Sequence, residues 1–189
     1  MLALRPQVPS TLMGGLEEGA GSMKHGILRA SRLVETLKGQ GVTHIVALPD
    51  SETSHFHNAL RAGKAIDLVP VSREGESIPI AAGLWIAGKK PVVMIQNAGL
   101  FESGDALRGM ALGINLPVVM FIGYRGYNRH GDTPDTAAQF LEPFLHMWRV
   151  NYYIIESDDD LDRIPLAFQQ AEKTGQPWAV LIGSEYAPG

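Results

Sequence analysis

The segment PVVMIQNAG at residues 91–99 decides the predicted fold. It opens with an unbroken apolar run and continues directly into two amide side chains and a glycine. A strand that is covered on both faces of a parallel sheet has such a continuous apolar run. In parallel sheets, ligands bind beyond the carboxyl ends of the strands. The segment therefore predicts a buried parallel strand whose last residues lie beside a ligand.

Similar apolar runs recur along the chain and alternate with amphipathic stretches of helical length. The spacing predicts one face of a first helix at Ile27, Ala30, Val34 and Leu37. A later helix is indicated by Leu161, Ile164, Pro165, Phe168 and Ala171. This alternation of strand and helix predicts a doubly wound α/β fold, with a mainly parallel six-stranded sheet and helices on both faces. The expected strands are residues 43–48, 68–71, 91–96, 117–122, 152–155 and 179–182.

Composition limits the domain organisation and the function class. A chain of 189 residues with 45% hydrophobic residues is long enough for one domain with a substantial core. We expect residues 26–189 to form this domain and residues 1–25, rich in proline and glycine, to be a flexible extension. The net charge of −4 and the scattered basic residues disfavour nucleic-acid binding.

The same composition bears on location and chemistry. The sequence has no cysteine, which excludes disulfides and thiolate chemistry. No apolar run approaches the roughly 20 residues that span a bilayer, and we expect a cytoplasmic protein.

Polar residues gather in the loops that follow the predicted strands, at residues 49–51, 72–76, 96–99 and 123–135. Gln96, Asn97 and Gly99 could line a cofactor or substrate site, or could form an ordinary turn. Arg125, together with Arg129 and His130, could bind a second anionic group of a substrate, because a guanidinium pairs with carboxylate, sulfonate or phosphonate oxygens. His130 could also move protons during catalysis. The alternative is a solvated polar loop.

Glu74 follows the strand at 68–71 and precedes a small-residue helical stretch at 77–88. By itself it could be a helix N-terminal glutamate stabilised by the helix dipole. Together with its neighbours, however, it resembles a motif of enzymes that use thiamine diphosphate: a glutamate, a glycine nine positions later, then an aromatic residue and another glycine. Glu74, Gly83, Trp85 and Gly88 reproduce this order.

Further segments make the resemblance more specific. The chain is similar to the pyrimidine-binding domain of thiamine diphosphate-dependent decarboxylases, in particular those acting on sulfopyruvate and phosphonopyruvate. The similarity covers about residues 26–126. It rests on LPDS at 48–51, SREGE at 72–76, AG at 82–83, GKKP at 88–91, MIQNAG at 94–99 and IGYRG at 122–126.

The resemblance implies roles for individual residues. Glu74 would be the catalytic residue that hydrogen-bonds the aminopyrimidine of thiamine diphosphate and so activates the cofactor. Gln96, Asn97 and Gly99 would line the cofactor. Ser51 would lie near the substrate carboxylate, although it is also a favoured helix-capping residue. The substrate-binding residues would be Ser51, Asn97, Arg125 and His130.

The resemblance also implies a partner. Enzymes of this family hold the cofactor diphosphate through Mg²⁺ with a Gly-Asp-Gly motif in a second domain, and aspartate and amide oxygens suit this cation. No Gly-Asp-Gly occurs in the sequence. We therefore expect a separate diphosphate-binding (beta) subunit that carries the motif and Mg²⁺, in a hetero-oligomer with at least two copies of each chain.

The resulting hypothesis is a decarboxylase subunit that, with its partner, converts an anionic 2-oxo acid of the 3-sulfopyruvate or 3-phosphonopyruvate type to the aldehyde and carbon dioxide. A different 2-oxo acid is one alternative, and a non-catalytic or regulatory subunit on the same fold is another. A nucleotide-binding α/β domain is disfavoured, because residues 49–51 replace the glycine-rich phosphate loop expected after the first strand.

Overall fold

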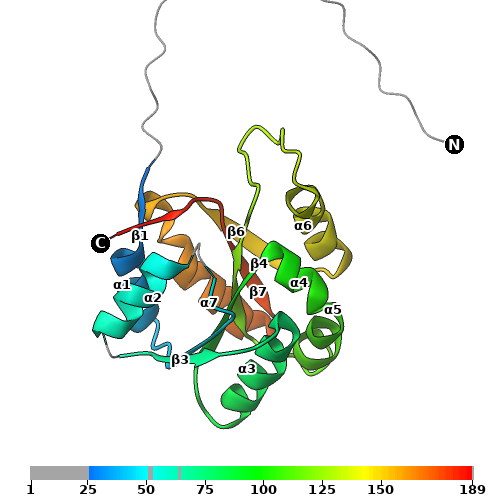
Figure 1. Cartoon of the computed structure of the whole chain (residues 1–189). Coiled ribbons are helices and arrows are strands. Elements are labelled where there is room, and N and C mark those ends of the chain that lie inside the picture. Colours follow the sequence, from blue (N-terminus) through cyan, green and yellow to red (C-terminus); the bar gives the residue numbers. More distant parts are fainter. Residues whose placement is uncertain (1–25, 51–52, 64, 189) are drawn as a thin grey trace, which may run out of the picture.

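A computed structural model describes residues 26–50, 53–63 and 65–188 (Figure 1). The predicted flexible extension at residues 1–25 and the predicted substrate residue Ser51 lie outside the described residues.

The centre of the molecule is a parallel sheet of six strands in the order β3-β2-β4-β5-β7-β6. Each predicted strand is present, with ends that differ from the prediction by at most about two residues, as is usual for such boundaries. The doubly wound α/β prediction is therefore confirmed. The strands are β2 (His44–Ala47), β3 (Asp67–Pro70), β4 (Pro91–Gln96), β5 (Val119–Gly123), β6 (Asn151–Ile155) and β7 (Trp178–Ile182).

Helices cover both faces of the sheet. Alternate residues of each strand point to opposite faces, so a single strand contributes side chains to both cores. On β5, Phe121 packs in one core, whereas Met120 and Ile122 pack in the other. The first face is covered by α1 (Ala30–Gly39), α2 (Ser54–Gly63) and α7 (Arg163–Thr174). The second is covered by α3 (Ser77–Ile86), α4 (Asn97–Glu102), the short α5 (Gly104–Ala106), the π-helical η2 (Leu107–Leu112) and α6 (Thr136–Met147).

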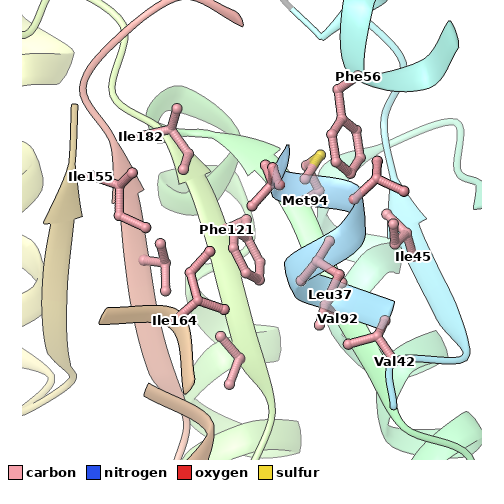
Figure 2. Close-up of a cluster of buried hydrophobic side chains, with 14 of the residues drawn as sticks. Leu37, Val42, Ile45, Phe56, Val92, Met94, Phe121, Ile155, Ile164 and Ile182 are labelled. Atoms are coloured by element: carbon pink, nitrogen blue, oxygen red, sulfur yellow. The ribbon is translucent and has the colours of Figure 1, made fainter. Parts of the chain in front are cut away.

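Figure 2 shows the core of the first face, where large side chains from α1 and α2 meet the sheet. Phe56 and Leu37 lie with Ile45, Met94 and Phe121 in one buried cluster. All five side chains are at most 3% exposed. This packing holds the strand ends that carry the polar loops.

Two features at the entry to the first helix differ from the sequence prediction. Ile27, expected on the face of the first helix, precedes it and is 56% exposed. The chain instead enters α1 through β1 (Leu28–Arg29), which pairs in parallel with β8 (Tyr186–Ala187) near the other terminus. Such a two-residue pair is too short to leave a periodic pattern in the sequence.

Among the described residues, no helix has the length and apolar character needed to cross a membrane.

Candidate functional site

The candidate site lies at the carboxyl ends of the parallel strands. β2 leads to α2 on one face and β4 leads to α4 on the other, so their connections diverge between these two neighbouring strands. Open α/β sheets bind ligands at such a point, because the diverging loops leave a crevice. The polar segments after β2, β4 and β5 all begin at this edge, and the segment after β5 extends well beyond the sheet (Figure 1).

A cleft of about 290 Å³ opens at this edge. Its walls come from the ends of β4, β5 and β7 and from the segments that follow β2, β5 and β7. Two of the predicted site residues, Gln96 and Arg125, lie in its wall. The lining residues are Asp50, Thr53, Met94, Ile95, Gln96, Gly123, Tyr124, Arg125, Gly126, Tyr127, Ile182, Gly183, Ser184, Glu185 and Tyr186.

Arg125 is the basic residue of this lining. Its Nε donates a hydrogen bond of 3.1 Å to Oδ2 of Asp135, and its side chain is 46% exposed. Asp135 also caps α6 by accepting a 2.8 Å hydrogen bond from the Ala137 amide. This backbone bond, and then Arg125, hold the pKa of Asp135 below its ordinary value. Because only Nε is engaged with Asp135, the terminal guanidinium nitrogens can donate to an anionic ligand.

Asn97 links the end of β4 to the Arg125 segment. Its side chain is fully buried, its Nδ2 donates to the carbonyl oxygen of Arg125 at 2.9 Å, and its Oδ1 accepts from the Ala98 amide at 2.9 Å. Residues 97–99, expected as a loop or turn, form the first turn of α4. Asn97 is not among the residues that line the cleft, and it contacts the backbone of Arg125, which is.

Glu74 lies against Gly99, although the two residues follow different strands. A Cβ atom added to Gly99 would fall 2.3 Å from Cγ and 2.7 Å from Oε1 of Glu74. Only glycine therefore leaves room for the glutamate side chain at this point. Glu74 is half-buried, and among the described residues no hydrogen bond or ion pair engages its carboxylate.

The neighbouring carboxylates, by contrast, have partners. Oε2 of Glu76 accepts hydrogen bonds from the amides of Ser72 and Arg73, at 3.0 and 3.2 Å. Glu102, at the end of α4, accepts from the Gly75 amide and from the Arg73 guanidinium. Glu74 therefore differs from these two carboxylates in having no partner among the described residues, and it lies outside the lining of the cleft.

His130 does not reach the cleft. It is exposed, and its amide donates to Oδ1 of Asn128. Arg129 is held in a two-bond ion pair with Glu156, at 3.0 and 2.6 Å. Of the basic side chains in this segment, Arg125 is the one that lines the cleft.

Asp50 makes the kind of local hydrogen bonds by which a side chain fixes the chain before a helix. Its Oδ1 accepts hydrogen bonds from the amide and the hydroxyl of Thr53, at 2.8 and 2.9 Å, just before α2 begins. The cleft wall therefore contains a carboxylate that is already occupied in fixing the start of a helix.

Sequence reasoning missed several residues of the site. Tyr127 lies over Gly183, where an added Cβ would be 2.8 Å from the tyrosine ring, and both residues line the cleft. Tyr124 donates to Oε1 of Glu142 on α6 at 2.9 Å, and burial, with Glu142, raises its pKa above the ordinary value. These contacts join distant segments, so no local pattern indicated them.

No group of three or more His, Cys, Asp or Glu side chains that could hold a metal ion occurs within residues 26–50, 53–63 and 65–188.

Comparison with known proteins gives a consistent family match. The model of the family described as thiamine pyrophosphate enzyme, N-terminal TPP binding domain, matches residues 29–142. Sulfopyruvate decarboxylase subunit alpha of Methanococcus maripaludis is 29% identical over 162 residues, which is 84% of this chain and 97% of that protein. The subunit alpha of Methanocaldococcus jannaschii is 28% identical, over 82% of this chain and 92% of its own. Phosphonopyruvate decarboxylase of Streptomyces viridochromogenes is 30% identical over 57% of this chain but only 27% of its own length.

Proposed function

Because the chain belongs to the thiamine pyrophosphate enzyme family, matching its N-terminal cofactor-binding domain, we propose that it is the pyrimidine-binding subunit of a decarboxylase. The proposed reaction converts a 2-oxo acid with a second anionic group, of the 3-sulfopyruvate or 3-phosphonopyruvate type, to an aldehyde and carbon dioxide. The names of the relatives, all of them decarboxylases of these two acids, support this assignment.

The observation that carries the proposal is the position of Glu74. Its half-buried carboxylate has no partner among the described residues and is packed against a glycine that leaves room for it. A carboxyl group with this freedom fits the need of an aminopyrimidine, whose ring nitrogen must share a hydrogen bond with an acid. The residues present therefore fit the pyrimidine end of thiamine diphosphate.

Glu74 would hold a proton between its carboxyl group and the pyrimidine nitrogen. Gln96 and Gly99 would line the same cofactor, Gly99 by keeping space for the glutamate. When bound, thiamine diphosphate supplies the nucleophilic carbon and the electron acceptor that decarboxylation of a 2-oxo acid requires.

Arg125 would bind the second anionic group of the substrate, because its guanidinium lies in the cleft wall with its terminal nitrogens available. Asn97 would position Arg125 through the bond to its carbonyl oxygen. Ser51 and His130 remain proposed substrate residues. The first lies outside the described residues, and the second would have to move from its exposed position to contribute.

The partner would be a diphosphate-binding subunit that carries the Gly-Asp-Gly motif and Mg²⁺. The chain spans nearly the whole of two proteins named as alpha subunits and about a quarter of the phosphonopyruvate decarboxylase, which supports a division of the enzyme between chains. Most of the large apolar side chains exposed among the described residues lie on the α3 to α6 side, including Ile80 and Ile86 on α3 and Met110 on η2. Exposed apolar surface of this kind is typical of an interface.

The proposal is tested by co-expressing the chain with a diphosphate-binding subunit and measuring carbon dioxide release from 3-sulfopyruvate, 3-phosphonopyruvate and pyruvate. Glu74→Gln keeps the size of the side chain and removes its acid, so we expect turnover to fall about 100-fold or more, the range for a lost acid–base group. Glu35→Gln is the matched control, because Glu35 is an exposed residue of α1 paired with Lys38.

Full activity of the Glu74→Gln complex would favour the non-catalytic alternative and contradict the proposal. Release of carbon dioxide by the chain without a partner would contradict the division between subunits.

A further inference from the structure

α4 contacts the segment that carries Glu74 at two points. Gly99 lies against the Glu74 side chain, and Glu102, three residues later on the same helix, reaches the residues on either side of Glu74. Residues three apart lie on the same face of a helix. One face of α4 therefore contacts this segment twice, through the close packing of Gly99 and through the hydrogen bonds of the Glu102 carboxylate.

Glu102 makes two hydrogen bonds across this contact. Its Oε2 accepts from the Gly75 amide at 2.5 Å, and its Oε1 accepts from the Arg73 guanidinium at 2.7 Å. A Cβ atom at Gly75 would lie 2.8 Å from Oε2, so the close approach of the carboxylate depends on glycine there. The residues before and after Glu74 are thus fixed by one carboxylate from another element.

We propose that Glu102 is a positioning residue that fixes the orientation of Glu74 toward the cofactor, an inference that rests on the proposed function. The other bonds of this segment are local. Glu76 binds the amides of Ser72 and Arg73, and the Ser77 hydroxyl donates to the Glu74 carbonyl oxygen. These bonds fix the shape of the turn, whereas the bonds of Glu102 fix its place relative to α4.

The test uses the complex with the partner subunit and compares Glu102→Gln with Asp105→Asn. Asp105 is a matched control, because it is an exposed carboxylate three residues further along, in α5, paired with Arg108. We expect Glu102→Gln to weaken binding of thiamine diphosphate, measured by calorimetry, and to lower kcat about 10- to 100-fold, since a displacement of about 1 Å at a reacting group has effects of this size. The thermal midpoint should stay close to that of Asp105→Asn. Leu100, a fully buried residue of α4, is unchanged in both variants, so the packing of this helix on the core should be kept.

A double variant separates positioning from a general structural effect. If Glu102 acts through Glu74, Glu102→Gln should cost little further activity or cofactor affinity when it is added to Glu74→Gln. Full, independent losses in the double variant would overturn the inference, as would a Glu102→Gln complex that behaves like Asp105→Asn.

The single variant Glu74→Gln separates this inference from the proposed function. If Glu74→Gln is harmless, the proposed function fails and the inference fails with it. If Glu74→Gln is strongly impaired and Glu102→Gln is not, only the inference about Glu102 fails.

Discussion

Gly99→Ala should separate the activity of the protein from its stability. The added Cβ would fall 2.3 Å from Cγ of Glu74. Carbon atoms in contact lie about 3.5 to 4.0 Å apart, so the glutamate must move by about 1 Å or more. Its neighbours are held by Glu76 and Glu102, and the shift therefore falls mainly on the Glu74 side chain.

The fold should tolerate this change. Alanine favours a helix over glycine by about 0.5 to 1 kcal/mol. A side chain forced about 30° from its rotamer costs about 0.5 to 1.5 kcal/mol. The two contributions nearly cancel, so the free energy of unfolding should change by less than about 1 kcal/mol. A catalytic group displaced by about 1 Å, however, can lose about 100-fold in rate.

The assay measures carbon dioxide release and denaturant unfolding on the same preparations. Gly39→Ala is the control, because Gly39 ends α1 and an added Cβ would meet nothing within 4 Å. Full activity of Gly99→Ala would refute the reasoning about Glu74. A loss of more than about 3 kcal/mol of stability would refute the reasoning about the fold, because it would exceed the strain of one side chain.

Three further predictions concern the anion site, the partner surface and a cap. Arg125→Ala should raise KM for an anionic 2-oxo acid about 10- to 100-fold, as expected for a lost charged hydrogen bond, and should leave KM for pyruvate nearly unchanged. Ile86→Lys should weaken co-purification with the partner at least about tenfold, because an apolar contact of about 1.5 to 3 kcal/mol is lost. Leu166→Lys on α7 should have no such effect. Equal loss in both variants would contradict the assignment of the α3 to α6 side as the partner interface. The pKa of Asp135 is lowered below its ordinary 3.8, first by the Ala137 amide and then by Arg125, so its contribution to stability is present above about pH 4 and is lost as the pH falls further. The stability difference between the parent and Asp135→Asn should therefore shrink below that pH, as measured by urea unfolding, and a difference that stays constant down to pH 2 would contradict this.

Most of the sheet could be predicted because its four central strands, β2, β4, β5 and β7, are almost entirely buried. An apolar run such as residues 91–95, followed directly by polar residues, fits few structures other than a buried parallel strand. The start of α4 could not be predicted in the same way. Asn97 and Gly99 are common in turns, and the burial of the whole segment against the sheet, which a local pattern does not contain, places them in a helix.

Several residues of the candidate site could be predicted from the sequence, but the contacts between them could not. Resemblance to a family identified Glu74 and Gly99 separately, yet their contact depends on how the segment after β3 turns back over α4. Glu102 gave no signal, because its partners are 27 and 29 residues away and one of them is a backbone amide. His130 belonged to the same polar loop as Arg125, but the Arg129–Glu156 pair holds that part of the loop outside the cleft wall.

The arrangement makes α4 the element that sets the distances within the site. Asn97 holds the carbonyl oxygen of Arg125, Gly99 accommodates Glu74, and Glu102 holds Gly75. All three contacts depend on the register of a six-residue helix that begins directly after β4. A change in that register would move the proposed cofactor acid and the proposed anion-binding guanidinium together. The length of the segment from residue 97 to residue 102 should therefore tolerate less change than the residue types of the longer segment between β5 and α6.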